Sequence, residues 1–323
     1  MKIWGVAMMR NEGDIVEAMV RHNLTILDGL IVVDHGSTDA TVDILKALHV
    51  EGLRLVVLRN DLPGYLQAEI TTTAVRHAFA RGGADAVIPL DADEFLRVPA
   101  RGALERAIAA IPAAHCGGIA WRTYVPPFTG THIDMVALIR ASRRIAAEPE
   151  HPPDVRDKVV LTRAFAADPT ANLVMGNHRV VLGSNVLLSP RMPQVNVPAS
   201  AITVCHLPVR SASQFIVKVT IKRLARVAAA RDYPQGSNIR RAWDAMCRGE
   251  PLTPALMLQS HVAGHLTPAD ALAADTVATV DDPFLADIHL RYTTPAPADP
   301  LPLVLTAVER LARRLGRSST PSG

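Results

Sequence analysis

Two aspartates separated by one residue, Asp91 and Asp93, are the clearest chemical signal in the sequence. They follow an apolar run at residues 84–90, which predicts a buried strand. Because both carboxylates come at the end of this strand, they can turn toward one cation. Mg²⁺ and Mn²⁺ take oxygen ligands from one or two carboxylates and from substrate phosphates. The pattern predicts a metal site that neutralises a diphosphate leaving group, with a solvated acidic turn as the alternative.

Strands and helices alternate in the N-terminal part of the sequence, and this alternation predicts how the carboxylates are held. The predicted strands are residues 2–9, 30–34, 53–58 and 84–90, and the predicted helices are residues 14–27, 41–48 and 65–81. Such an order implies parallel βαβ units with helices on both faces of one sheet. Ligands of open α/β sheets bind beyond the carboxyl ends of the strands. Asp34 and the cluster at residues 91–94 fall at such ends.

The rest of the chain predicts a mixed extension of the sheet and then a helical region. Residues 119–204 alternate short β-like pieces with Pro-rich turns, and the chain is mainly helical after Cys205, with residues 214–231 the clearest helix. We therefore divide the chain into a catalytic core, residues 1–205, and a C-terminal region, residues 206–323. The C-terminal region is expected to complete the site and to end in a basic amphipathic helix.

The composition excludes several classes of protein. A chain of 323 residues with 49% hydrophobic and 20% charged residues predicts a packed globular protein. The net charge of +3 and the aromatic content of 4% argue against a nucleic-acid partner. Three cysteines without a CxxC pair predict neither a zinc site nor disulfides, which fits a reducing, cytoplasmic setting. The short apolar run at residues 3–9 predicts a buried strand rather than a signal peptide.

Four motifs in order resemble family 2 glycosyltransferases of the GT-A fold, in the branch with an extended Asp-Ala-Asp-Glu-Phe motif. The motifs are Met9-Arg10-Asn11-Glu12, Val33-Asp34-His35-Gly36-Ser37-Thr38-Asp39, Asp91-Ala92-Asp93-Glu94-Phe95, and His206-Leu207-Pro208-Val209-Arg210-Ser211 with Gln214, Phe215 and Lys218. The resemblance covers about residues 1–220. It implies a Rossmann-like, mixed and mostly parallel sheet, a nucleotide-diphosphate sugar donor (a UDP-sugar is favoured) and Mn²⁺ or Mg²⁺.

The resemblance also implies roles for individual residues. The donor-binding residues would be Asn11, Glu12, Asp34, Gln67, Asp91, Glu94, Arg210 and Lys218, and the metal ligands would be Asp91, Asp93 and His206. Within this set, Asp34 would contact the base or ribose, Glu94 would orient the sugar, and the two basic residues would bind phosphate. The alternatives are a helix cap for Asn11 and Glu12, a solvated surface for Lys218, and a structural role for His206.

The sequence departs from the usual family pattern at the catalytic base. No Glu-Asp pair lies between residues 119 and 204, which leaves Asp157 and His178 as candidates. An imidazole suits proton removal near neutral pH, and either residue can instead be a satisfied core or turn group. The predicted reaction is an inverting sugar transfer to a hydroxyl of a carbohydrate, lipid-linked or small-molecule acceptor, in the synthesis of surface polysaccharide, glycolipid or glycoconjugate.

Two other enzyme classes and a non-catalytic binding protein are the alternative functions. A nucleotidyltransferase should show a Gly-rich basic loop after the first strand, but residues 8–13 carry one Gly and an acidic residue. A Rossmann dehydrogenase needs a G-x-G-x-x-G motif, which is missing. A non-catalytic nucleotide-sugar binding protein stays open, because the usual base is missing while Asp91 and Asp93 are intact. The last helix, about residues 303–315, can rest on an anionic membrane, although docking on the core is preferred.

Overall fold

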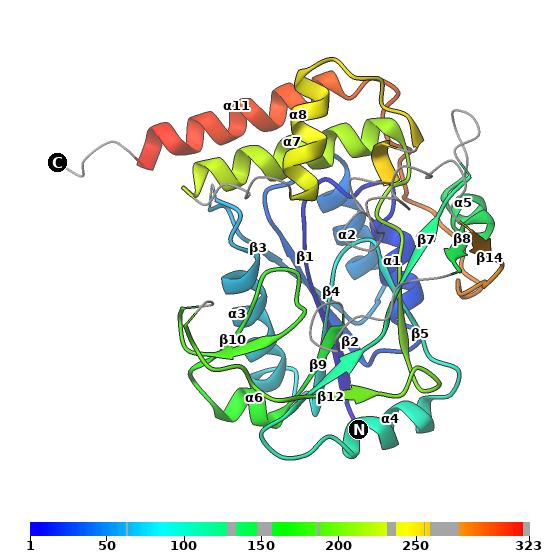
Figure 1. Cartoon of the computed structure of the whole chain (residues 1–323), viewed down its shortest axis with the longest axis vertical. Helices are drawn as coiled ribbons and strands as arrows, with labels where there is room; N and C mark the ends of the chain where they lie inside the picture. Colours follow the sequence, from blue (N-terminus) through cyan, green and yellow to red (C-terminus); the bar gives the residue numbers. More distant parts are fainter. Residues whose placement is uncertain are drawn as a thin grey trace.

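The structure is a computed structural model that describes residues 1–62, 64–127, 134–146, 157–185, 188–230, 237–254, 256–258 and 278–318. Its strands are β1 (Ile3–Met9), β2 (Gly29–Asp34), β3 (Leu55–Arg59), β4 (Ala86–Leu90), β5 (Glu94–Arg97), β6 (Cys116–Ile119), β7 (Trp121–Val125), β8 (Arg143–Ile145), β9 (Lys158–Thr162), β10 (Ala171–Leu173), β11 (Val180–Leu182), β12 (Gln194–Val197), β13 (Thr203–His206) and β14 (Thr279–Val280). Its helices are α1 (Val16–Asn23), α2 (Thr41–Val50), α3 (Gln67–Ala80), α4 (Arg101–Ala109), α5 (Met135–Ala141), α6 (Arg163–Ala167), α7 (Ala212–Ala228), α8 (Asn238–Cys247) and α11 (Leu301–Ser318). Figure 1 shows the sheet at the centre, with α7, α8 and α11 crossing one end of it.

The central sheet has seven strands in the order β12-β6-β9-β4-β1-β2-β3. The pairs β4/β1, β1/β2, β2/β3 and β12/β6 are parallel, whereas β9 runs antiparallel to both of its neighbours. The predicted mixed, mostly parallel α/β sheet is therefore confirmed. The chain goes from β1 outward to β3 and then returns to the other side of β1 as β4. Because the strand order reverses there, a crevice is expected between the carboxyl ends of β1 and β4.

Proline is unusual inside a sheet, yet Pro89 lies in β4 between β1 and β9. The register explains why it is tolerated: β1 pairs with β4 as far as Leu90, whereas β9 pairs only with Ala86 and Val87. At Pro89 the strand therefore has a paired neighbour on one side only, which is the edge-like position where a missing backbone donor costs least.

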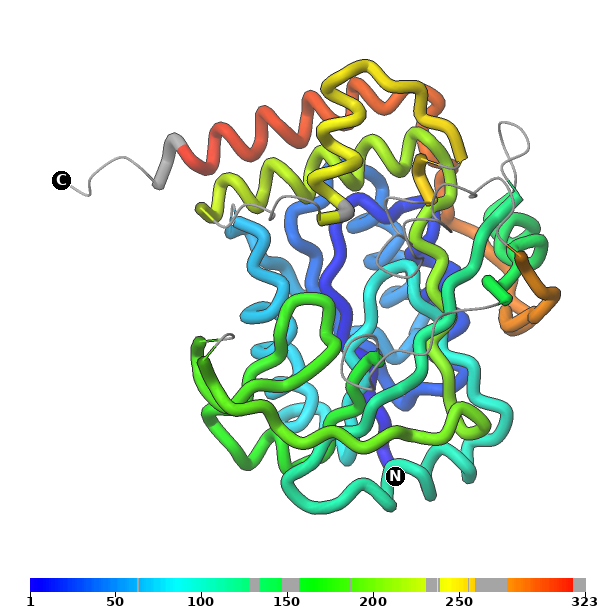
Figure 2. The backbone as a smooth tube through the Cα atoms, viewed as in Figure 1, coloured from blue at the N-terminus to red at the C-terminus, as the bar shows by residue number. Residues whose placement is uncertain are grey.

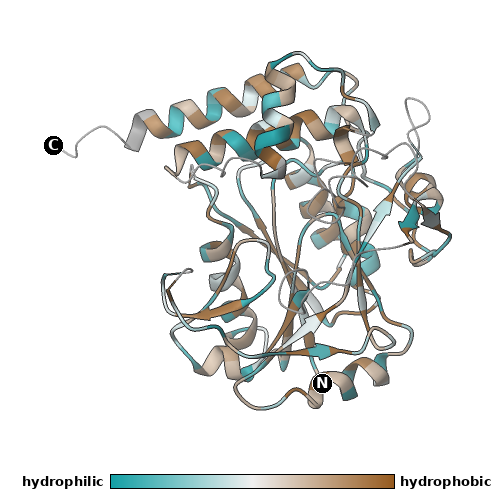
Figure 3. Cartoon of the chain, viewed as in Figure 1, coloured by the Kyte–Doolittle hydropathy of each residue, from teal (hydrophilic) through white to brown (hydrophobic). Residues whose placement is uncertain are grey.

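Both faces of the central sheet are covered by helices, as the sequence predicts. Alternate residues of β1 enter two separate hydrophobic clusters, because successive side chains of a strand point to opposite faces. Ile3, Ala7 and Met9 pack with side chains of α1 and α2, and Val6 and Met8 pack with side chains of α3. Figure 3 shows the strands of this sheet mainly in the brown of hydrophobic residues.

A second sheet, in the order β14-β8-β7-β13-β5, brings late parts of the chain to the end of β4. Strand β5 begins immediately after the Asp91–Asp93 motif and pairs antiparallel with β13. In this register His206, the last residue of β13, lies opposite Glu94. A histidine more than a hundred residues away in sequence is thus placed beside the aspartate motif by strand pairing.

The C-terminal region packs along the core. Figure 2 shows the red tube of α11 beside the yellow-green tube of α7. Residues 281–300 form no helix or strand, and part of this segment covers α1. There the carboxylate of Glu17 accepts bonds from the backbone N–H groups of Arg291, Tyr292 and Thr293 at 2.8, 2.7 and 2.8 Å. Within the described ranges, no helix has the length and apolar character needed to cross a bilayer.

Candidate functional site

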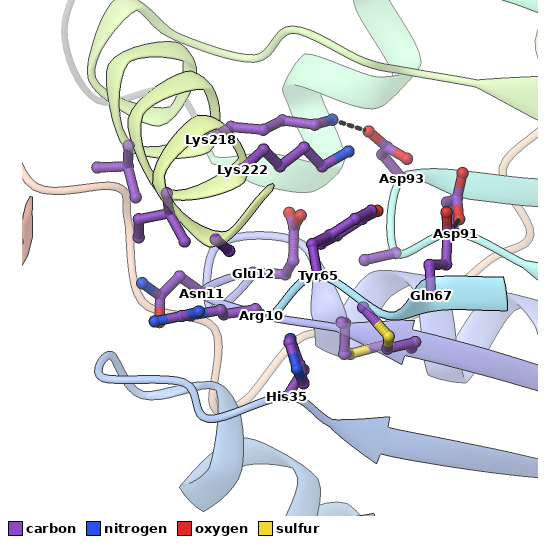
Figure 4. Close-up of a pocket in the computed structure, with 16 residues that line it drawn as sticks. Arg10, Asn11, Glu12, His35, Tyr65, Gln67, Asp91, Asp93, Lys218 and Lys222 are labelled. Carbon is purple, nitrogen blue, oxygen red and sulfur yellow. Dashed lines mark hydrogen bonds and ion pairs between the residues drawn. The ribbon is translucent and has the colours of Figure 1, made fainter. Parts of the chain in front are cut away.

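A pocket opens at the carboxyl ends of β1, β2 and β4, under one face of α7. Its lining residues are Met8, Met9, Arg10, Asn11, Glu12, His35, Tyr65, Gln67, Asp91, Ala92, Asp93, Val217, Lys218, Ile221, Lys222 and Ala225. Figure 4 shows Lys218 and Lys222 reaching from the helix toward Asp93, with Asp91 and Gln67 beyond it. The pocket therefore lies where the strand order reverses, which is the expected ligand position in this kind of sheet.

Asn11 ties two of the loops around the pocket together. Its backbone has a φ of 56°, a left-handed conformation that asparagine adopts more readily than most residues. Its side-chain oxygen accepts the Thr38 N–H at 2.7 Å, and its own N–H donates to Ser37 Oγ at 3.0 Å. The loop after β1 is thereby held against the loop after β2. Asn11 lines the pocket where the sequence predicts a donor-binding residue, but it does not act as a side-chain cap of α1.

Asp91 is held from both sides by side chains of other elements. Gln67, the first residue of α3, donates its Nε2–H to Asp91 Oδ1 at 2.8 Å. Lys158 Nζ donates to Asp91 Oδ2 at 3.0 Å. Burial raises the pKa of the Asp91 carboxyl, but the Lys158 ammonium outweighs it and the pKa lies below the ordinary value. Asp91 is thus an ordered carboxylate, and Gln67 positions it.

Glu94 and Lys158 form a fully buried ion pair beneath Asp91. Lys158 Nζ lies 2.8 Å from Glu94 Oε1, and both side chains are fully buried. The other Glu94 oxygen, Oε2, accepts the Asp91 backbone N–H at 2.8 Å. Burial raises the pKa of Glu94, and the Lys158 ammonium opposes this rise. Burial lowers the pKa of Lys158, but its two carboxylate neighbours outweigh this effect and raise it. Glu94 does not line the pocket, so in this structure it supports Asp91 and Lys158 from below.

Asp93 faces His206 and Lys218. His206 Nε2 lies 3.6 Å from Asp93 Oδ1, and Lys218 Nζ donates to Asp93 Oδ2. Burial would raise the pKa of Asp93, but the Lys218 ammonium and then His206 hold it well below the ordinary value. Burial lowers the pKa of His206, so its imidazole is neutral at pH 7 and able to act as a ligand. The histidine predicted from sequence is therefore at the aspartate motif.

The chemistry of these side chains suits a hard divalent cation that arrives with a diphosphate. Asp91 and Asp93 offer oxygens and neutral His206 offers a nitrogen, which are ligand types that Mn²⁺ accepts. Within the part of the chain that the structure describes, no group of three or more His, Cys, Asp or Glu residues is arranged as a complete metal site. Mg²⁺-type sites commonly use one or two carboxylates and complete their shell with phosphates and water. The residues fit such a shared site.

Arg210 is buried and bound by two acidic residues of the loop after β1. Its Nε donates to Asp14 Oδ2 at 2.7 Å, and its Nη2 donates to Asp14 Oδ1 at 2.9 Å and to Glu12 Oε2 at 2.6 Å. The planar fork makes this pairing bidentate. Arg210 Nη1 is buried without a partner. Arg210 is predicted from the sequence to bind phosphate. In this structure most of its guanidinium is instead bound to Glu12 and Asp14, which links the loop before α7 to the loop after β1.

The loop after β2 also shapes the pocket, but through a different residue from the predicted one. Both oxygens of Asp34 accept backbone N–H groups of its own turn, from Gly36 at 3.1 Å and Ser37 at 3.1 Å, and Asp34 does not line the pocket. Its neighbour His35 does line it and is 1% exposed. Burial, followed by repulsion from Arg10, lowers the pKa of His35 to about 4.

The two candidate bases lie side by side near the motif but outside the pocket lining. His178 Nδ1 lies 3.3 Å from the backbone oxygen of Asp157. Burial and then the Lys158 ammonium lower the pKa of His178 to about 3. The Trp121 ring packs near both histidines of this region, with its centroid 5.4 Å from that of His178 and 4.4 Å from that of His206. The argument for His178 from a near-neutral imidazole pKa does not hold in this environment.

Sequence reasoning missed several residues that the structure brings to the site. Lys158 was overlooked because it begins a strand that reads as purely structural, and Trp121 because a lone aromatic carries no spacing signal. Lys222 lies four residues after Lys218, and that helical spacing was a signal available in the sequence. Its ammonium lies 5.9 Å from the centre of the Tyr65 ring, and both residues line the pocket.

Two arginines of α11 bind the loops behind the pocket. Arg310 Nη1 donates to the Ser37 backbone oxygen at 2.6 Å, and Arg314 Nη2 donates to Asp61 Oδ1 at 2.5 Å. Ala307 and Leu311 are buried, and Ala307 packs with side chains of α7. Helix α11 is therefore docked on the core, as preferred from the sequence. Its outward side chains Leu301, Leu305, Val308 and Leu315 are exposed.

Residues 6–135 match the family model described as glycosyl transferase family 2. The match spans less than half of the chain and includes the loops after β1, β2 and β4 that form the pocket. It supports the predicted resemblance over this part of the sequence, although it does not test the extended form of the aspartate motif. No curated protein matches the chain.

Solved structures with weak similarity include several enzymes. TarS of S. aureus in complex with UDP is 12% identical over 100% of this chain and 93% of that chain, with a TM-score of 0.39. The mannosyltransferase PcManGT from Pyrobaculum calidifontis in complex with GDP-Man and Mn²⁺ is 16% identical over 85% and 79%, with a TM-score of 0.38. Glucosyl-3-phosphoglycerate synthase from Mycobacterium tuberculosis in complex with Mn²⁺, UDP and phosphoglyceric acid is 15% identical over 73% and 80%, with a TM-score of 0.35. These scores are too low to transfer a ligand or an activity.

Proposed function

We propose that the protein is a glycosyltransferase that moves a sugar from a nucleotide-diphosphate donor to an acceptor hydroxyl. One observation carries this proposal. The part of the chain that matches glycosyl transferase family 2 supplies, at the strand-order reversal, a pocket lined by Asp91 and Asp93. A UDP-sugar is the favoured donor, and the acceptor belongs to surface polysaccharide, glycolipid or glycoconjugate synthesis.

The donor-binding chemistry of this pocket is divided between acidic and basic side chains. We assign the divalent cation to Asp93 and His206, with Asp91 beside them. When bound, such a cation neutralises the charge that develops on a departing diphosphate. Lys218 and Lys222 line the opposite wall on α7 and supply positive charge for the phosphates. Asn11 and His35 line the part of the pocket formed by the loops after β1 and β2, where the nucleoside would lie.

The transfer itself requires a base for the acceptor hydroxyl. The base accepts the hydroxyl proton, the oxygen attacks the anomeric carbon, and the bond to the diphosphate breaks, so that the product has inverted configuration. Of the two candidates, we favour Asp157, because the pKa of about 3 removes the advantage of His178. The Asp157→Asn protein should bind nucleotide normally and lose transfer, whereas His178→Gln should retain most of it. The opposite pattern would move the base to His178.

We further propose a cytoplasmic enzyme that can work at a membrane surface. The exposed apolar side chains of α11 support such contact, whereas Arg310 and Arg314 are engaged with the core and leave fewer cations for anionic lipid. Sedimentation with anionic vesicles checks this. A Leu305→Glu protein should remain in solution if α11 is responsible.

The direct test of function is thermal stability against a panel of nucleoside diphosphates and nucleotide sugars, with and without Mn²⁺. A ligand that binds only the native state raises the melting temperature. At a ligand concentration of a hundred times Kd, it adds about 2.7 kcal/mol to the free energy of unfolding. We expect one nucleotide to give a Mn²⁺-dependent rise that is lost in Asp93→Asn. Arg313→Ala, an exposed change on α11, is the matched control and should respond like the wild type.

The sugar that binds should then be offered to acceptor mixtures, with nucleoside diphosphate release as the readout. Binding without release or hydrolysis would favour a non-catalytic nucleotide-sugar binding protein. No response to any nucleotide at saturating Mn²⁺ would contradict the proposal. Retention of the donor's anomeric configuration would contradict only the inverting mechanism.

A further inference from the structure

The carboxylate assigned to the cation is already paired with a lysine. Lys218 Nζ donates to Asp93 Oδ2 and lies 3.3 Å from the Pro208 backbone oxygen. The two side chains are only 10% and 4% exposed, so this is an interior pair rather than a surface contact. An unpaired carboxylate at this depth would be costly, and Lys218 provides its counter-charge.

The same carboxylate faces His206 on its other oxygen, at 3.6 Å from Asp93 Oδ1. A divalent cation shared by Asp93 and His206 would therefore lie next to the Lys218 ammonium. Two cations that compete for one buried carboxylate repel each other strongly, because the surroundings screen charge poorly. Lys218 and the cation are thus alternative partners of Asp93.

The Lys218 ammonium can take a second position within the same pocket. It lines the pocket together with Lys222, one helical turn further along α7. Ser211 caps this helix, its Oγ accepting the Gln214 N–H at 3.1 Å, so the backbone that carries both lysines is fixed. The lysine side chain is a flexible four-carbon stem, so its ammonium can move while the helix stays in place. A diphosphate in the pocket would offer it new oxygen partners.

We propose that Lys218 is an exchangeable counter-ion. In the donor-free protein it holds Asp93, and when the nucleotide and cation bind together it leaves Asp93 for a phosphate oxygen. The inference rests on the proposed function and adds to it that cation and nucleotide binding depend on each other. Either ligand alone binds weakly. The cation must displace Lys218 from Asp93, and a diphosphate without the cation can draw Lys218 away only by leaving the buried Asp93 carboxylate without a counter-charge. When both bind, the cation compensates Asp93 and the diphosphate takes up Lys218, so each ligand makes binding of the other more favourable.

Two titrations test the exchange without any measurement of turnover. Mn²⁺ binding is followed from the paramagnetic resonance signal of the free ion, with and without saturating UDP, and with GDP if UDP does not bind. UDP binding is followed by calorimetry, with and without Mn²⁺. By reciprocity, UDP and Mn²⁺ must strengthen each other by one common factor, for which we expect about 10-fold or more in the wild type.

The Lys218→Met protein should change the two affinities in opposite directions. Mn²⁺ alone should bind about 10-fold tighter, because its competitor is gone, and UDP in the presence of Mn²⁺ should bind about 10-fold weaker, because a phosphate partner is gone. Lys218→Arg keeps the charge and should keep weak binding of Mn²⁺ alone. Lys222→Met removes a charge from the same helix face and should weaken UDP without tightening Mn²⁺. Melting temperatures verify that each variant is folded.

Two results would overturn the exchange while leaving the proposed function standing. One is unchanged or weaker binding of Mn²⁺ alone to Lys218→Met, which would make Lys218 a simple phosphate ligand. The other is equal tightening of Mn²⁺ in Lys222→Met, which would show a general effect of pocket charge. Failure of the wild type to bind UDP or GDP at any Mn²⁺ concentration would overturn both the exchange and the proposed function.

Discussion

Lys158 joins Asp91 and Glu94 through a single buried ammonium group, 3.0 Å from Asp91 Oδ2 and 2.8 Å from Glu94 Oε1. The same nitrogen donates to the Gly176 backbone oxygen at 2.9 Å. One strand residue thus fixes the first aspartate of the motif, the glutamate three residues later and the turn before His178. The Lys158 ammonium is also 5.9 Å from the centre of the Trp121 ring.

Replacing Lys158 by Met should destabilise the protein strongly. The change leaves the buried Glu94 carboxylate and the partly exposed Asp91 carboxylate without their cation. Breaking one side of a buried pair costs about 3–5 kcal/mol. Urea denaturation measures the loss. Glu94→Gln in the same protein removes one of the two orphaned charges, so the double variant should be more stable than Lys158→Met alone. A double variant that is less stable would contradict the pairing.

Removing the imidazole of His206 should weaken Mn²⁺ binding in the presence of UDP. Even residues that only orient metal ligands change affinity by about 10–100-fold, so loss of a direct ligand should cost at least as much. His206→Ala is compared with His178→Ala by resonance titration of Mn²⁺. Both rings contact Trp121, so the second variant reproduces the packing loss. Equal effects of the two variants would argue that His206 acts through packing alone.

The arginines of α11 should support nucleotide binding from behind the pocket. Arg310 holds the Ser37 backbone oxygen, and Arg314 holds Asp61. A charge-assisted hydrogen bond contributes about 1.5–3 kcal/mol, part of which orders the loop after β2. Arg310→Ala with Arg314→Ala should therefore weaken UDP binding in calorimetry, by about 3–10-fold if half of the free energy of one such bond acts at the pocket. Arg313→Ala, whose partner Glu309 lies on the same helix, should not change UDP affinity.

Acid should destabilise the protein in part through His22. Its Nε2 donates to the Leu96 oxygen at 2.7 Å, and its Nδ1 accepts the Ala286 N–H at 3.0 Å, so the folded protein requires the neutral ring. Burial lowers its pKa in the folded state, partly opposed by the bond to Leu96. The unfolded chain, with a histidine pKa of about 6.5, therefore takes up the proton first as pH falls. The stabilisation is complete above that pH and is lost progressively below it.

The His22 contribution is isolated by comparing wild type with His22→Gln in urea denaturation at pH 7.5 and 5.5. The wild type should lose more unfolding free energy on acidification than the variant does. His35 also has a lowered pKa, but it is present in both proteins and cancels in the difference. Equal losses would mean that His22 does not titrate with folding.

The fold was predictable wherever the local pattern of apolar residues determines whether a segment is a helix or a strand. The alternation of apolar strands and amphipathic helices up to Leu90 anticipates β1 to β4 in order, with boundaries shifted by a few residues: the helix expected to reach residue 27 ends at Asn23. The second sheet was not predictable, because its strands of two to five residues carry no periodicity and pair across long separations. The pairing of β14 with β8 joins residues more than a hundred positions apart.

The site was predictable where residue type and strand end coincide. Asp91, Asp93, Asn11 and Glu12 meet in the pocket, as do Gln67 and Lys218. A motif does not predict the hydrogen-bond and ion-pair partners of its side chains. Asp34 bonds within its own turn, Arg210 is bound by Glu12 and Asp14, and Glu94 by Lys158, because the tertiary contacts that decide these pairings come from distant segments.

The four bonds that residues 291–293 give to the Glu17 carboxylate, three from backbone N–H groups and one from the Thr293 hydroxyl, link the first helix to a segment near the end of the chain. The ribosome releases Glu17 long before it releases Thr293. Throughout that interval the emerging N-terminal half holds a carboxylate whose intended partners have not yet been made, except for Arg21. Helix α1 therefore gains these bonds only after residues 291–293 have been synthesised.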